Sequence, residues 1–452
     1  MSTYTDKGDL TKGDIPHHLI RLSIPMIWGI MAIISYQLVD TFYLSLLGTQ
    51  QLAAIGYTYP VTMFVFSLIM GFSIATSSVV SRQIGEGGRA VVKRLVTHSI
   101  IIATLAGSLI AGIGLFIAPW LFHTIGARGD ILELVLAYII IWLPAGIGLA
   151  IPMVGNAAIR AGGDTTTPAI IMMAAAALNI VLDPLLIFGP GPFPQLGIQG
   201  AAIATLIANG ITAIAALIIL TRKGMLSPNA LHLSAFGNSC RRILAIALPV
   251  ALTNVMQPVT NAVLIAILAG FGHAGVAAYG VAIRIEAFAF IVIMALATGM
   301  APLIGQNIGA RLYDRLHQIL RLAMRFAVGW SLFIALLLGL FAAPIAGIFT
   351  DDAEIARIMQ LYFLIIPISY IPGNLVPGWA SAFNAMGMPG RTVMMLFVRM
   401  FVLMIPLGFL GAWAYEAEGM FFGIAASNVI AGTVFHFWNR KWLADRTVST
   451  LS

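Results

Sequence analysis

The stretch from Gly200 to Thr221, GAAIATLIANGITAIAALIILT, holds 22 residues and no charged side chain. About 20 consecutive apolar residues, wound as an α-helix, cross the hydrocarbon core of a bilayer. Eleven further runs of this kind follow one another along the 452 residues, so the sequence predicts an all-α integral membrane protein with twelve transmembrane helices. The twelve predicted spans are 19–47, 52–80, 92–118, 131–158, 166–188, 200–221, 243–270, 275–303, 317–347, 353–385, 391–414 and 419–439.

The composition excludes several other classes of protein. Hydrophobic residues make up 60% of the chain and charged residues only 9%, against about 25% in soluble domains. So few charges could not cover the surface of soluble domains, so a nucleic-acid-binding protein or a soluble enzyme is not expected. One cysteine, Cys240, excludes an intramolecular disulfide and a multi-cysteine metal site. The polar segment 1–18 lacks the pattern of a cleaved signal peptide.

The basic residues predict the orientation of the chain in the membrane. Of the 24 Lys and Arg residues, 20 lie on one side of the predicted helices, at the termini, in connections that follow even-numbered spans or in the parts of spans next to these. Arg128 and Arg357 lie on the opposite side, and Arg284 and Arg399 lie inside spans. By the positive-inside rule, we expect both termini in the cytoplasm of a bacterium and the protein in its inner membrane. The same rule accounts for the net charge of +7 without a nucleic-acid partner.

The second half of the chain repeats the first at a constant offset, the one that places Pro25 on Pro249. Because each repeat holds six predicted helices, an even number, the two halves share one orientation in the membrane. Such parallel repeats are related by an axis along the membrane normal, as in several alternating-access transporters. The sequence therefore predicts two six-helix lobes related by a pseudo-two-fold axis. Further matched positions include Gly48–Gly56 with Gly272–Gly280, Tyr138 with Tyr362, and Gly163 with Gly387.

The repeat also predicts the domain limits. We expect an N-terminal lobe over residues 1–221, a cytoplasmic linker over 222–242 and a C-terminal lobe over 243–452.

Two acidic residues inside the first lobe are candidates for an ion-coupling site. Asp40 and Asp183 both fall roughly 10 Å from the outer ends of their spans, at 1.5 Å per residue. Tyr36 and Gln37 share the helix face of Asp40, and Asn179 shares that of Asp183. An ionisable group within a membrane is costly and indicates function. Because two carboxylates repel each other in an apolar setting, we expect at least one to accept a proton near neutral pH.

The second half of the repeat serves as an internal control. At the offset of the repeat, Asp40, Asn179 and Asp183 correspond to Leu264, Leu403 and Leu407. A scaffold can therefore do without these polar groups, which favours a coupling function over a structural hydrogen-bonding role. A metal centre is not favoured, because two carboxylates lack the His or third acid that such sites usually have.

The second lobe has its own charged residues within spans. Arg284 and Glu286 lie in the eighth span and Arg399 in the eleventh. Residues two apart do not face each other on a helix, so we expect Glu286 to pair with Arg399. A role in substrate binding or gating is the alternative to a structural ion pair.

These features resemble the multidrug and toxic compound extrusion (MATE) family, and within it the DinF-like branch. The resemblance rests on Pro25 and Asp40 in the first span, the motif Asn179-x-x-x-Asp183-Pro184 in the fifth and the Gly200–Thr205 start of the sixth.

The resemblance implies a role for each candidate residue of the first lobe. Asp40, Asp183 and Asn179 would form the cation-coupling network. Two further candidates for it are Asn156, in the fourth span, and Thr205, one turn after the position where relatives often carry Thr and this chain has Ala201. Tyr36, Gln37 and Pro25 would line the substrate cavity or its gate, with the first helix bending at Pro25.

The implied function is a secondary active multidrug efflux antiporter, not an enzyme. It would export amphipathic or cationic organic compounds in exchange for protons by alternating access, as a monomer among membrane lipids and without a cofactor beyond the coupling ion. The seventh and tenth spans lack the acids of NorM-like members, which favours protons over sodium. A sodium-coupled antiporter and a lipid-linked precursor flippase are the alternatives.

Overall fold

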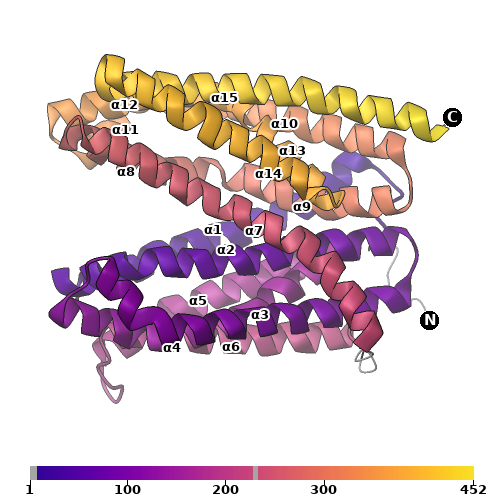
Figure 1. Ribbon diagram of the computed structural model, residues 1–452, viewed down its shortest axis with the longest axis horizontal. Helices are drawn as coiled ribbons and strands as arrows, with labels where there is room; N and C mark the ends of the chain where they lie inside the picture. The colour runs from indigo at the N-terminus through magenta and orange to yellow at the C-terminus, as the bar shows by residue number, and fades with distance from the viewer. Residues whose placement is uncertain (1–7, 228–232, 452) are drawn as a thin grey trace.

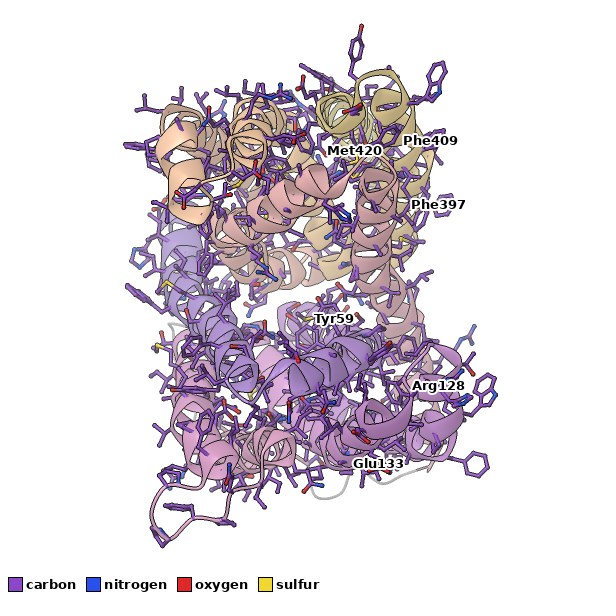
Figure 2. The ribbon with its side chains drawn as sticks, turned by 90° about the vertical axis from the view of Figure 1, so that its left-hand side faces the viewer. Tyr59, Arg128, Glu133, Phe397, Phe409 and Met420 are labelled. Atoms are coloured by element: carbon purple, nitrogen blue, oxygen red, sulfur yellow. The ribbon has the colours of Figure 1, made fainter. Side chains whose placement is uncertain are left out.

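The computed structural model describes residues 8–227 and 233–451, and within these residues the chain forms helices and no strand. The helices form two lobes, indigo to magenta and salmon to yellow in Figure 1, with both termini at the same end of the molecule. Exposed apolar side chains such as Phe397 and Phe409 point away from the C-terminal lobe (Figure 2), as expected of a surface that faces lipid. The predicted all-α membrane fold with two lobes is confirmed.

Each lobe has six membrane-crossing units. The N-terminal lobe comprises α1 (Ile15–Ser45), α2 (Thr49–Gly85), α3 (Arg89–Thr124), α4 (Gly129–Ala161), α5 (Thr166–Phe188) and α6 (Ile198–Arg222). The C-terminal lobe comprises α7 (Leu233–Ala269), α8 (His273–Ala289), α9 (Ile291–Gly309), α10 (Tyr313–Leu340), α11 (Ala342–Phe349), α12 (Ala353–Gly373), α13 (Leu375–Ala385), α14 (Pro389–Phe397), the π-helical segment η2 (Val398–Met404) and α15 (Ile405–Leu451).

Kinks explain why the elements do not correspond one to one with the predicted spans. By length and composition, 11 helices in the described residues could cross a membrane. One of these runs from Pro389 to Asp445 and contains a break at Tyr415 and Glu416, whose backbones are not helical. The break lies between the predicted spans 391–414 and 419–439, so this one unit makes two crossings. The helical crossings then number twelve, in agreement with the sequence.

Helix α7 connects the two lobes. Figure 1 shows it crossing from the lower lobe to the upper one. Its first half packs on the N-terminal lobe, where Ile243 and Val250 belong to the core and Ser239 hydrogen-bonds His98 of α3 (Oγ to Nδ1, 2.8 Å). Leu264, near its end, lies in the core of the other lobe. By its packing, the first half of α7 therefore belongs with the N-terminal lobe, beyond the limit at residue 243 that the repeat predicts. Residues 228–232 of the predicted linker lie outside the described residues.

Glycines let the lobes approach each other closely at the end that holds the termini. A methyl group added at Gly309 of α9 would lie 2.1 Å from the carbonyl oxygen of Arg82 in α2, and one at Gly85 would lie 2.1 Å from the carbonyl oxygen of Gln306. Real side chains cannot approach so closely, so both positions need glycine. Ser78 of α2 also donates a hydrogen bond to the carbonyl of Asn384 in α13. The two lobes are thus closed against each other at this end.

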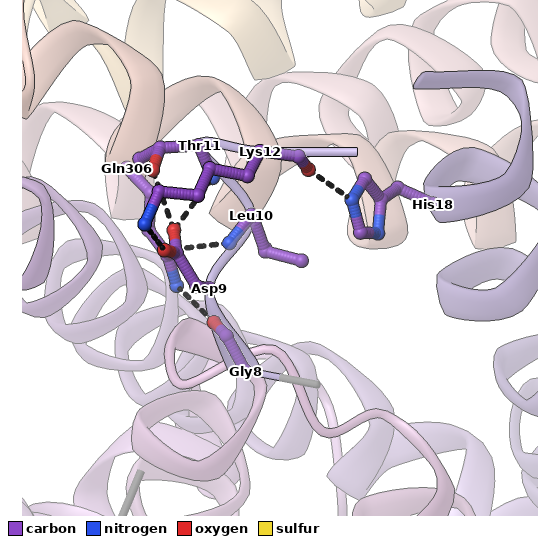
Figure 3. Close-up of polar contacts among 7 residues, drawn as sticks. All are labelled: Gly8, Asp9, Leu10, Thr11, Lys12, His18 and Gln306. Atoms are coloured by element: carbon purple, nitrogen blue, oxygen red, sulfur yellow. Dashed lines mark hydrogen bonds and ion pairs between the residues drawn. The ribbon is translucent and has the colours of Figure 1, made fainter. Parts of the chain in front are cut away.

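We call this contact of α2 with α9 and α13 the closed seam. The segment before α1 also bridges it, and Figure 3 shows the contacts of that segment with Gln306. The Leu10 amide donates to Oε1 of Gln306 (3.0 Å). Asn307 Nδ2 donates to the Leu10 carbonyl (3.0 Å). Gln306 also donates from Nε2 to the carbonyl of Ala161, at the end of α4 (2.8 Å). The Leu10 side chain is fully buried. One α9 amide therefore ties the N-terminal segment to both lobes.

We predict that Gly309→Ala weakens this closed seam. The added methyl must displace a backbone carbonyl, and overpacking of this kind typically costs about 1–3 kcal/mol. The melting temperature of the purified protein in detergent should fall by several degrees. Gly280→Ala is the matched control, because nothing lies within 4 Å of the added methyl. Equal melting temperatures for the two variants would contradict the assigned contact.

Candidate ion-coupling site

Helices α1 and α5 pack together and carry the two predicted acids at matching depth. The packing is close because a methyl at Gly29 would lie 3.2 Å from the Cα of Ala169. Asp40 lies five residues before the end of α1, and Asp183 five residues before the end of α5. Both helix ends lie away from the closed seam, since α1 and α5 begin next to it. The common depth predicted from the sequence is therefore present.

Asp183 is buried and Asp40 is partly buried, and both have a carboxylate oxygen without a hydrogen-bond donor among the described residues. The Asp183 side chain is 1% exposed, and among the described residues neither of its oxygens has a hydrogen-bond partner. The same is true of Oδ1 of Asp40. The two acids lie close enough for their charges to interact. Because an unpaired buried carboxylate is costly, this arrangement is stabilised by any proton or cation that neutralises one of them.

Two tyrosines complete the cluster. Tyr36 of α1 and Tyr138 of α4 both interact electrostatically with Asp40 and Asp183, and Tyr138 is 7% exposed. Tyr36 was expected here, since it stands one helical turn before Asp40. Tyr138 was missed as a site residue. The repeat pairs Tyr138 with Tyr362, and this match is the one feature of the sequence that marks Tyr138. The match does not indicate that Tyr138 lies near the two acids.

The other predicted residues of the first lobe differ in their placement. Asn179 is buried one turn before Asp183, and its Nδ2 donates to the carbonyl of Ala175 (3.3 Å). Thr205 is partly buried, seven residues after the start of α6. Gln37 is exposed, and α1 continues as a helix through Pro25.

Asn156 lies outside the cluster. It stands 18 residues after Tyr138 on α4, which at 1.5 Å per residue is roughly 27 Å along the helix. Asn156 is buried, and its Oδ1 has no hydrogen-bond partner among the described residues. Tyr138 is the residue of α4 that lies near both acids. Asn156 is therefore too far along the same helix to join them, contrary to the expectation.

The second lobe arranges its charges differently from the expected ion pair. Glu286 accepts a hydrogen bond from the hydroxyl of Tyr362, and Arg399 donates from Nη2 to Oδ1 of Asn428 (2.8 Å). Glu286 and Arg399 interact electrostatically, but no salt bridge joins them in the described part of the chain. Arg399 lies in the π-helical segment η2, and Arg284 is exposed. Among the residues described, no group of three His, Cys, Asp or Glu side chains could hold a metal ion.

A family model matches both lobes. The model is that of MatE, and it covers residues 25–185 and 249–410. The chain belongs to the MatE family. The two matched segments start at Pro25 and Pro249, the pair of residues that defines the offset of the internal repeat. Since members of this family are transporters, the chain is a multi-pass membrane transporter and not an enzyme.

Named relatives cover the whole length of the chain. An FAD transporter of Shewanella oneidensis is 35% identical over 434 residues, which is 96% of each chain. The multidrug export protein MepA of Staphylococcus saprophyticus is 25% identical over 441 residues, covering 95% of this chain and 93% of its own. The crystal structure of the Vibrio cholerae MATE transporter VcmN in the bent form has a TM-score of 0.90 at 31% identity, covering 96% of this chain and 98% of its own. The family resemblance is thus confirmed.

We predict that Tyr138→Phe lowers transport several-fold while the protein is still made and inserted. The variant removes only a hydroxyl, whose loss leaves the two carboxylates with one fewer polar neighbour. Tyr57→Phe is the control, because it makes the same change in the same lobe at a hydroxyl that lies beside Gly126, in the connection between α3 and α4. Transport should be measured in cells at matched expression. Equal losses in both variants would remove Tyr138 from the site.

Proposed function

We propose that this protein is a secondary active exporter in which Asp40 and Asp183 exchange protons for amphipathic or cationic organic compounds. The observation that carries the proposal is the pair of neighbouring acids: Asp183 is buried with no hydrogen-bond donor among the described residues, and Asp40 is partly buried with an unpaired Oδ1. Such a pair of acids binds a proton or cation strongly while it is shielded from water, and releases it when the conformation exposes the acids to water. A ligand shifts a conformational equilibrium only through unequal affinity for the two states.

The closed seam supports alternating access, in which the protein opens to one side of the membrane and then to the other. The Gly309 contact and the Leu10 bridge hold the lobes together at the end with the termini. With the termini in the cytoplasm of a bacterial cell, as we propose from the basic residues, this conformation is closed to the cytoplasm. Protons reaching Asp40 and Asp183 from outside would displace the exported compound. Opening the seam would then expose the acids to the cytoplasm, where the protons leave.

We predict that Asp40→Asn and Asp183→Asn each lower drug resistance and efflux at least tenfold. An amide has nearly the shape of the acid but cannot take up or release the coupling proton. Resistance and dye efflux should be measured in cells that express equal amounts of each variant.

Asp164→Asn is the matched control for these substitutions. Asp164 lies in the loop between α4 and α5. Burial raises its pKa, but hydrogen bonds from Thr167 and Lys223 outweigh this and hold the pKa below its ordinary value. Its carboxylate therefore stays charged at neutral pH and cannot carry the coupling proton. Full resistance in both Asp40→Asn and Asp183→Asn would refute the proposed site.

The coupling ion can be identified in liposomes. We expect a pH gradient alone to drive export of a cationic dye by the reconstituted protein, and a sodium gradient alone to give less than a tenth of that rate. The reason is that proton uptake needs only the two acids, whereas a sodium site needs several oxygen ligands in a fixed geometry. Transport driven by sodium alone would favour the sodium-coupled alternative.

Export of FAD is a second candidate function. The observation that favours it is the 35% identity over nearly the full length with a protein named as an FAD transporter. Liposomes loaded with FAD in place of the dye separate the two. Proton-driven release of FAD without release of the dye would assign the protein to flavin export, and release of the dye alone would assign it to drug efflux. Movement of neither, with a lipid-linked precursor moved instead, would favour the flippase.

A further inference from the structure

A cavity in the C-terminal lobe is lined by basic side chains and has no part in the proposed coupling site. It has a volume of about 340 Å³ and lies between α10, α13 and α15. Its residues His317, Arg321 and Arg325 follow the start of α10, where Arg315 hydrogen-bonds the carbonyl of Gly13 in the N-terminal segment. No Asp or Glu is among its lining residues. The basic side chains that line it are His317, Arg321, Arg325, His436 and Arg440.

The basic residues form two columns that face each other across the cavity. His317, Arg321 and Arg325 are spaced four apart on α10, so they share one face of that helix. His436 and Arg440 have the same spacing on α15. Arg321 and Arg325 carry like charges at this spacing, which destabilises a helix unless a counter-charge is present. The two columns therefore favour an anion between them.

The arginines are free to bind such an anion. Arg321, Arg325 and Arg440 are exposed, and none forms a hydrogen bond or salt bridge with any other described residue. The salt bridges among the described residues are formed by other cations, namely Lys12, Lys223 and Arg357. Arginine presents several N–H groups in a planar fork that matches the oxygens of a phosphate group.

One histidine can donate a hydrogen bond from its ring to a ligand in the cavity. The indole Nε1 of Trp379 donates a hydrogen bond to Nδ1 of His436 (3.3 Å), and Trp379 itself is 2% exposed. Because Nδ1 accepts, the ring proton of neutral His436 is carried on Nε2. The remaining wall of the cavity is apolar, formed by residues that include Leu320, Met324 and Leu375.

The depth of the cavity matches the headgroup region of a bilayer. Helix α10 has 28 residues, a length of roughly 42 Å, of which a hydrocarbon core takes about 30 Å. Counted from the far end at Leu340, the core takes up about the last 20 residues. Arg321 stands at this boundary and Arg325 one turn inside it. Basic pockets between membrane helices at this depth bind anionic lipid headgroups.

We propose that this cavity binds the phosphate-bearing headgroup of an anionic phospholipid in the leaflet on the side of the termini. The arginines of the two columns contact the phosphate and any further anionic group, and the apolar wall contacts the glycerol and the first part of the acyl chains. Binding there joins α10, α13 and α15 and stabilises the C-terminal lobe. The inference does not depend on the transported substrate or on the coupling ion.

The test is the stabilisation of the full chain by lipid. The melting temperature of the protein purified in neutral detergent is measured against phosphatidylglycerol, against the zwitterionic phosphatidylcholine and against inorganic phosphate, with bound lipid counted by native mass spectrometry. We expect phosphatidylglycerol to raise the melting temperature at a lower concentration than phosphatidylcholine does, and inorganic phosphate to have no comparable effect.

The variants locate the binding site. At about fivefold in apparent affinity per cation, Arg325→Gln should weaken phosphatidylglycerol binding about fivefold, and Arg321→Gln with Arg325→Gln and Arg440→Gln more than tenfold. Arg222→Gln, an exposed arginine at the same side of the other lobe, should bind as the wild type does. If the triple variant does not purify, the single variant decides.

Three results would overturn the proposal. Equal stabilisation by phosphatidylcholine would show that the charge of the headgroup is not recognised. An equal effect of inorganic phosphate would assign the cavity to a free anion. Unchanged phosphatidylglycerol binding in Arg325→Gln would place the lipid elsewhere.

Discussion

A buried carboxylate without a donor is the constraint on which the first lobe depends. Asp183 lies among apolar helices, and no described residue hydrogen-bonds either of its oxygens. In a soluble protein such a group would be paired or hydrated. Here Asp40 adds a second acid to the same site, so the pair can be neutralised in more than one way. Helix α1 packs on α5, with a close approach of Gly29 to Ala169, so the two acids lie on neighbouring helices. The free energy of neutralising them is what an antiporter can couple to a change in lobe arrangement.

The two lobes share one plan of helices but not one chemistry. The repeat pairs Tyr138 with Tyr362, and each of these tyrosines lies beside a carboxylate of its own lobe. In the first lobe the acids are Asp40 and Asp183, and in the second the acid is Glu286, which accepts a hydrogen bond from Tyr362. The second acid is therefore satisfied where Asp183 is not. The same scaffold thus holds a site suited to ion exchange in one lobe and a hydrogen-bonded polar core in the other.

Much of the fold follows from residues that could be recognised without coordinates. The apolar runs, the constant offset of the repeat and the acids at matching depth all depend on local composition or on regular helix geometry. Tyr138 escaped recognition because its contact with the acids requires α4 to approach α1 and α5, which no sequence spacing specifies. The misplacement of Asn156 has a different cause: its role came from the family resemblance, although the predicted span 131–158 already puts it near the end away from the acids. Its burial suited a site residue, but its position along α4 separates it from the cluster.

The sequence by itself determined the membrane class, the helix count and the two-lobe plan, and it singled out the two acids that we propose for coupling. The reason is that a hydrocarbon core demands long apolar helices and makes every charge within them conspicuous. Only the tertiary structure decided how the lobes meet. The glycine contacts of Arg82 with Gly309, the Leu10 bridge to Gln306 and the facing cations of α10 and α15 join residues far apart along the chain. Such contacts depend on the packing of whole helices, which the local pattern of a sequence does not specify.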